Sequence, residues 1–186
     1  ILNPETTYLW YDICCCPGYH DTFQNTFDCV SACDFTIILV PGCKHYDRIN
    51  PQTKRKQHMC YRTYRLRARC VLETFGAFLT TKGGRRAKPM LLVRNGSGTP
   101  NWISPLECQK LKVGMSTFRC CETNHARSET CSRINAEKCL GNMIDTRAES
   151  LFEVGRYEEA RMTICLKQWW LRGFENHIKT RVKYTS

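Results

Sequence analysis

Phe35-Thr36-Ile37-Ile38-Leu39-Val40 is the longest apolar stretch of this chain, and Pro41-Gly42 follows it directly. A short apolar run that ends at a strong turn signal is typical of a buried β-strand. Before it, residues 1–34 contain prolines and a glycine that interrupt any regular pattern, so we expect an irregular segment with a short helix over Asp28–Asp34. After it, the polar segment 44–57 is expected to form a loop.

The segment 59–81 alternates with a period of two residues, which predicts a β-strand with one apolar and one basic face. The expected apolar face holds Cys60, Tyr64, Leu66, Ala68 and Cys70, with Arg62 among them, and the expected basic face holds Tyr61, Thr63, Arg65, Arg67 and Arg69. We expect β-structure to continue over Phe75–Thr81, to turn at Gly83-Gly84, and to return over Met90–Val93.

After Pro105 the apolar residues recur every three or four positions, which predicts helices. The expected helices are Glu107–Cys121, Ser128–Leu140 with an end at Gly141-Asn142, and 146–154 and 157–172 with an interruption at Gly155-Arg156.

The fold class expected from these elements is α+β, in one disulfide-stapled domain over residues 1–186. Its sub-regions are an irregular acidic segment at 1–50, a basic β ribbon at 51–103, and a helical part at 104–186.

Fourteen cysteines are spread from Cys14 to Cys165. An even number at this density is typical of small secreted proteins that are stabilised by disulfides. We therefore expect up to seven disulfides and a secreted, extracellular protein. The number of possible pairings is too large for the connectivity to be deduced from the sequence.

The spacing of the cysteines does not predict a zinc site. Structural zinc is usually held by Cys-x2-4-Cys pairs, and the only such pair here is Cys29 and Cys33, without a second one. A thioredoxin-like centre would need Cys-x-x-Cys, which the chain lacks. The sequence thus predicts neither a bound metal ion nor a cofactor.

Other features agree with an extracellular location. The chain begins Ile1-Leu2-Asn3, as expected when a signal segment has been removed or the chain has been shortened. Asn95-Gly96-Ser97 is an N-glycosylation sequon in a loop-like setting. No run of 18 apolar residues occurs, so no transmembrane segment is expected.

Positive charge is concentrated in the middle of the chain. Residues 1–50 hold two basic and six acidic side chains, whereas residues 51–94 hold twelve basic and one acidic. Residues 95–186 hold fourteen basic and ten acidic side chains. Such asymmetry bears on the choice of partner rather than on the fold.

Arg65, Arg67 and Arg69 would form a cationic ridge on the predicted strand, spaced by about 7 Å. In a helix, Arg62 would align with Arg65 and Arg69 instead. The expected ridge is extended by Lys54, Arg55, Lys56, Arg85, Arg86 and Lys88. Guanidinium groups bind sulfate, phosphate or carboxylate in bidentate fashion. Outside the cell this favours sulfated glycans and acidic protein surfaces over nucleic acid.

Two alternatives to an exposed ridge are open. The arginines could pair with acidic groups of the segment 1–50 or serve only solubility. The basic runs Lys54-Arg55-Lys56 and Arg67-Ala68-Arg69 could also be sites of proteolytic processing.

Trp169 and Trp170 are further binding candidates. They lie about 100° apart on a helix, so we expect one to be buried and the other partly exposed.

Two short stretches resemble known families. Cys15-Cys16-Pro17-Gly18-Tyr19-His20-Asp21 is similar to the active-site segment of secreted phospholipases A2, which implies a calcium-dependent lipid hydrolase with His20 and Asp21 as its catalytic pair. The spacing differs by one residue, Pro17 and Gly18 would break the required helix, and no glycine-rich calcium loop precedes it.

The second stretch, Leu151–Ala160, is similar to the turn of a tetratricopeptide repeat, in which Leu, Gly, Tyr and Ala join two antiparallel helices. The similarity is confined to this part of the chain and has no second copy at a 34-residue offset. It implies a local helix–turn–helix.

These observations predict a non-enzymatic, secreted, disulfide-rich binding protein of the receptor-ligand, toxin or effector type. Its expected partner is an extracellular protein receptor or a sulfated glycan, engaged through the basic ribbon. The alternatives are the lipid hydrolase and a structural or assembly protein crosslinked between chains, as a homo- or hetero-oligomer.

Overall fold

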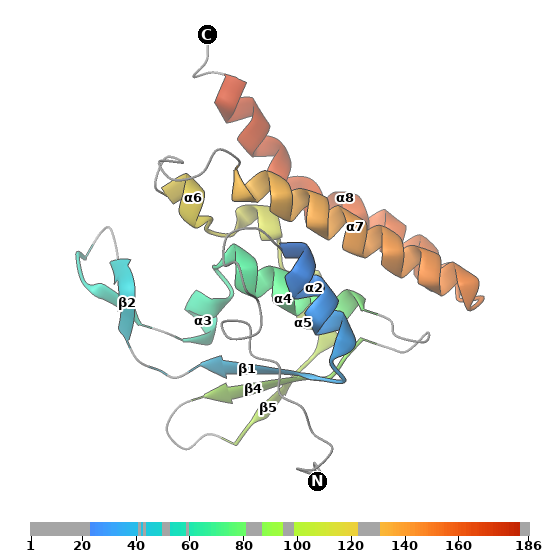
Figure 1. Ribbon diagram of the computed structural model, residues 1–186, viewed down its shortest axis with the longest axis horizontal. Helices are drawn as coiled ribbons and strands as arrows, with labels where there is room; N and C mark the ends of the chain where they lie inside the picture. The colour runs from blue at the N-terminus through green and yellow to red at the C-terminus, as the bar shows by residue number, and fades with distance from the viewer. Residues whose placement is uncertain are drawn as a thin grey trace.

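The computed structural model describes residues 23–40, 42, 44–49, 53–58, 60–80, 87–94, 99–122 and 131–182. Its architecture is mixed α/β, with helices stacked over one face of a small sheet (Figure 1). The irregular segment expected before residue 23 lies outside the described residues. No described helix is sufficiently long and apolar to cross a membrane.

The sheet has three strands in the order β1 (Thr36–Val40), β4 (Met90–Arg94) and β5 (Asn101–Ile103). β1 runs parallel to β4, and β4 runs antiparallel to β5. The strands expected over 35–40 and 90–93 are therefore confirmed. Two parallel strands must be joined by a crossover connection. Between β1 and β4 this connection includes a short hairpin and two helices, which lie within residues 44–80.

Side chains alternate between the two faces of the sheet, as strand geometry requires. Ile38 in β1 and Leu92 in β4 are buried, whereas Leu39 is 60% exposed. The buried face packs against α2 (Phe23–Ala32), α4 (Ala68–Leu79) and α5 (Pro105–Gln109). α2 agrees in part with the helix expected over Asp28–Asp34, although it begins and ends earlier.

α4 separates two hydrophobic cores. Its Ala77 packs into the core between the sheet and the helices. Its Phe75 packs into a larger core built with α7 (Ser132–Glu153) and α8 (Tyr157–Val182). Phe78 contacts both cores. The Trp170 ring of α8 meets Phe75 edge-on with centroids 5.5 Å apart, an arrangement that aromatic quadrupoles favour. The elements thus stack as sheet, α2 with α4, and α7 with α8 (Figure 1).

The prediction of a β ribbon over 59–81 is wrong, because this segment forms α3 (Tyr61–Tyr64) and α4. Within it, Val71, Phe75 and Leu79 recur at intervals of four residues and are buried on α4. Burial of that helical face outweighs the period-two pattern of the arginines, since it removes far more apolar surface from water. Extended backbone occurs only at cap residues of the described part of this segment, namely Cys60, Arg67 and Thr80, and Arg67 forms an isolated bridge with Thr117.

α7 and α8 form a helical hairpin. Their junction at Gly155 is confirmed: this glycine has φ +77°, and the Arg156 amide donates to the Leu151 carbonyl at 2.8 Å. Such a left-handed glycine and six-to-one hydrogen bond form a Schellman motif. The Asp145 carboxylate accepts from Lys167 Nζ at 2.6 Å between the two helices.

α7 does not end at Gly141-Asn142 as predicted. Leu140, Ile144 and Ala148 continue one buried stripe past this glycine, and their packing outweighs its low helix propensity.

The helix predicted over Glu107–Cys121 is also wrong. The chain forms α5, the 3-10 turn η2 (Val113–Met115) and α6 (Arg119–Glu122) instead. The reason is a close backbone approach between η2 and α8 at Gly114 and Gly173. The guanidinium of Arg133 donates to the carbonyl oxygens of both glycines and fixes this contact.

Residues 44–57 are not wholly a loop. β2 (Lys44–Ile49) and β3 (Lys56–His58) form a separate two-stranded antiparallel sheet. This hairpin lies at the edge of the molecule, outside the three-stranded sheet (Figure 1). The turn expected at Gly83-Gly84 lies outside the described residues.

The glycine contact predicts an unequal response to alanine. A Cβ at Gly173 would lie 2.8 Å from the carbonyl carbon of Gly114. This carbon is a backbone atom, so it cannot move aside without shifting the chain. Gly173→Ala should lower the free energy of unfolding by about 1–3 kcal/mol or more. Gly141→Ala should raise it by about 0.5–1 kcal/mol, because this helical glycine has open space around it. Urea denaturation of both variants measures the difference, and equal midpoints would contradict the contact.

Candidate functional site

Exposed cations gather on the β2–β3 hairpin and the residues that follow it. Lys54, Arg55 and Lys56 are exposed in the turn and first position of β3, and Arg62 is exposed on α3. Lys54 adopts a left-handed φ of 55°. We call residues 44–62 the basic hairpin. Because β2 and β3 stand apart from the helical layers, a large ligand could approach this hairpin without moving the cores (Figure 1).

Arg65, Arg67 and Arg69 do not form a common ridge. Arg65 lies 4.0 Å from a Glu107 carboxylate oxygen, and Arg69 pairs with Glu73 at 3.5 Å. The Arg67 guanidinium stacks over the Tyr64 ring, 5.8 Å from its centroid. These arginines are half-buried, and the two acidic partners named here come from α4 and α5. Their main contacts are within the fold.

Lys88 is a structural residue rather than a ligand for an external anion. Its side chain is only 8% exposed. Its ammonium donates to the carbonyl oxygens of Val30 at 3.0 Å, Ser31 at 2.6 Å and Cys33. These carbonyls belong to the end of α2, where the last turn lacks partners and the helix dipole is negative. Lys88, two residues before β4, thus ties the start of this strand to the end of α2.

The two tryptophans have different environments, as the helical offset predicts. Trp170 is 1% exposed and belongs to the aromatic contact with Phe75 and Phe78. Trp169 is 43% exposed, and Lys112 Nζ lies 4.0 Å from its ring centroid. Trp169 is therefore the one of the pair that a partner could contact.

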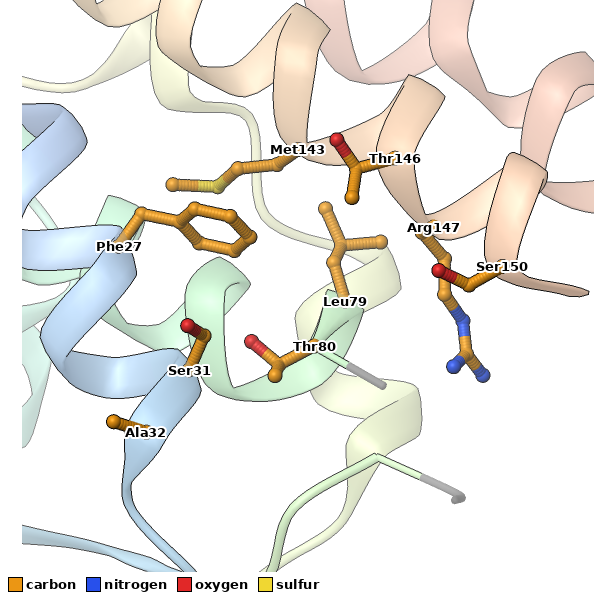
Figure 2. A pocket seen from close by; sticks show the side chains of 9 residues that line it. All are labelled: Phe27, Ser31, Ala32, Leu79, Thr80, Met143, Thr146, Arg147 and Ser150. Atoms are coloured by element: carbon orange, nitrogen blue, oxygen red, sulfur yellow. The ribbon is translucent and has the colours of Figure 1, made fainter. Parts of the chain in front are cut away.

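A cavity of about 360 Å³ lies between α2, α4 and α7 (Figure 2). Phe27, Leu79 and Met143 provide an apolar wall (Figure 2). Its polar lining comes from Ser31, Thr80, Thr146, Arg147 and Ser150. These residues come from three distant segments, so no local motif could have indicated the cavity.

Arg147 brings a buried positive charge to this cavity. Burial lowers its pKa to about 10, the nearby charge of Arg156 acts in the same direction, and Glu159 opposes them. The apolar wall and the charge of Arg147 suit a small amphipathic anion. Two of the lining hydroxyls, those of Ser31 and Thr80, already donate hydrogen bonds to carbonyl oxygens of their own helices.

Three sulfur atoms meet where α6 approaches the start of α7. Cys121 Sγ lies 3.8 Å from Cys120 Sγ and 3.7 Å from Cys131 Sγ, and all three lie within 4.8 Å of one another. Burial opposes ionisation of Cys120, but hydrogen bonds from Ser132 and the neighbouring thiols outweigh it and lower its pKa. Burial and the neighbouring sulfurs raise the pKa of Cys121 to about 12.

Among the ten cysteines in the described ranges, no two are joined by a disulfide. Cys14, Cys15, Cys16 and Cys43 lie outside these ranges. The predicted disulfide framework thus stays a prediction. Cys108 is buried beneath the sheet, and burial together with the charge of Glu107 raises its pKa to about 12.

Several predicted site residues lie outside the described residues. They are the proposed catalytic pair His20 and Asp21, the basic residues Arg85 and Arg86, and the glycosylation candidate Asn95. The basic surface discussed below therefore consists of the described side chains alone.

Comparison with known proteins gives no match, since no family model, curated protein or solved structure is significantly similar to this chain. Functional inference accordingly depends on the geometry and charge of the described side chains.

The contacts of Lys88 predict a stability effect that an exposed cation would not have. Lys88→Met keeps the apolar stem but leaves carbonyl oxygens at the end of α2 without their charged donor, so the free energy of unfolding should fall by about 2–4 kcal/mol. Lys138→Met, at an exposed position of α7, should change it by less than about 0.5 kcal/mol. Urea denaturation tests both variants, and equal stability would show that Lys88 does not support α2.

Proposed function

We propose that this protein is a secreted binding protein that captures an acidic partner surface or a sulfated glycan with its basic hairpin. The observation that carries the proposal is the exposure of Lys54, Arg55 and Lys56 on the projecting β2–β3 hairpin, with Arg62 exposed on the adjoining α3. The half-buried Arg65, Arg67 and Arg69, which follow α3 and begin α4, contribute to the fold and are not part of the proposed surface.

Charge and geometry support a polyanionic partner. Consecutive cations on an exposed hairpin raise the local concentration of an acidic ligand and speed its association. Arg adds bidentate contacts to sulfate or carboxylate groups, and Lys adds compact point charges. An exposed hairpin of this kind suits binding rather than catalysis, because the described residues of the hairpin enclose no place for a reacting group.

Secretion and disulfide pairing belong to the same proposal. They are supported by the number and even count of the cysteines, which is typical of small extracellular proteins. A protein stapled in this way would present the basic hairpin from a stiff scaffold. Preorganisation of that kind reduces the entropy lost on binding.

Elution from a heparin column tests the proposed surface. The triple variant Lys54→Glu/Arg55→Glu/Lys56→Glu should elute at clearly lower salt than the wild type. Its dissociation constant for heparin at 0.15 M salt should rise about tenfold or more, since several exposed ion pairs of up to about 1 kcal/mol each are lost. Circular dichroism must first show that both proteins are folded.

A matched control separates this surface from net charge. Lys110→Glu/Lys138→Glu/Arg172→Glu changes the same number of exposed cations on α7, α8 and the end of α5. It should elute near the wild type. An equal loss in both triple variants, or no retention of the wild type, would contradict the proposal. Competition by polyglutamate as strong as by heparin would favour an acidic protein surface over a sulfated glycan.

A further inference from the structure

The sulfur cluster of Cys120, Cys121 and Cys131 has the geometry of a metal site. The sulfur–sulfur distances of 3.7 and 3.8 Å, with the third below 4.8 Å, describe a small triangle. A point equidistant from its corners lies about 2.2–2.4 Å from each sulfur, and zinc–thiolate bonds are about 2.3 Å long. One zinc ion would therefore fit among the three sulfurs without rearrangement of the backbone.

A disulfide within this cluster would join only two of its three sulfur atoms. Adjacent cysteines such as Cys120 and Cys121 have Cα atoms about 3.8 Å apart, which is shorter than the usual Cα separation across a disulfide. Cys131 could therefore pair with one of them, and a third sulfur would remain beside that bond. Coordination of an ion would employ all three sulfur atoms at once.

The start of α7 places a positive helix end and hydrogen-bond donors beside two of the three sulfurs. Cys131 is the N-cap residue of α7, a helix of 22 residues whose N-terminal end is positive. The backbone and hydroxyl of Ser132, the first residue of that helix, hydrogen-bond to Cys120. Hydrogen bonds from the outer shell to ligating groups are a regular feature of metal sites. Cys131 is buried and the other two cysteines are half-buried, which limits access of water.

We propose that Cys120, Cys121 and Cys131 bind one zinc ion through their thiolates. Binding displaces the thiol protons to solvent and involves no oxidation or reduction. Within the described part of the chain no fourth His, Cys, Asp or Glu joins the three sulfurs, so water or another donor would complete the tetrahedron. The ion would connect α6 to the start of α7. This inference is independent of the basic hairpin and removes these cysteines from the predicted disulfide set.

Cobalt titration followed by zinc competition tests the site. Purified full-length protein, kept anaerobic, should bind one equivalent of Co²⁺ with the strong near-ultraviolet absorption of thiolate-to-cobalt charge transfer. Zinc should displace the cobalt. Cys131→Ser should weaken cobalt binding at least about a hundredfold, beyond the loss that removal of an outer-shell group causes. Cys165→Ser, an exposed position on α8 outside the cluster, should bind cobalt like the wild type.

A second measurement does not depend on the folding of a variant. Zinc added to the wild type should protect Cys120, Cys121 and Cys131 from alkylation, as shown by peptide mass spectrometry, and should leave Cys165 reactive. Two results would overturn the proposal. One is a disulfide that joins two of these three cysteines in the protein as isolated. The other is alkylation at an equal rate with and without zinc.

Discussion

The packing of α4 between two layers is the constraint on which the rest of this structure depends. Phe75 and Phe78 meet the Trp170 ring on one side, while Ala77 lies against the sheet on the other. A helix buried on both sides can tolerate few polar residues, and its close neighbours must be small or flat.

This constraint also explains how positive charge is distributed. The chain enters α4 through a segment rich in arginine, and the arginines nearest the helix are held by Glu73, Glu107 and tyrosine rings. Those further upstream, on the basic hairpin, remain exposed. Basic residues near the core thus stabilise the fold through contacts with other side chains, whereas those far from it face solvent. Distance from α4, rather than the spacing along the sequence, decides between these roles.

Local signals predicted the elements whose stability is local. The apolar run before Pro41-Gly42 is β1, and Gly155 ends α7 because a left-handed residue was required there. The segment 59–81 was mispredicted because two periodicities coexist in it and only distant partners select the helical one. Lys88, the cavity beside Arg147 and the sulfur cluster depend likewise on contacts between remote segments. The spacing rule for zinc ligands missed the cluster because Cys120 and Cys121 are adjacent, a pattern outside that rule.

The parallel pairing of β1 with β4 has a consequence for the order of folding. Thr36 pairs with Met90, and the whole crossover lies between them in the sequence. By contrast, α7 and α8 are joined by a turn of a few residues. Closing the longer loop costs more entropy before any contact is gained, so contacts of the helical hairpin are expected to form first and the sheet afterwards. Until then β1 is an unpaired strand of strongly apolar sequence. In the nascent chain that strand is the segment most in need of protection from association with other chains.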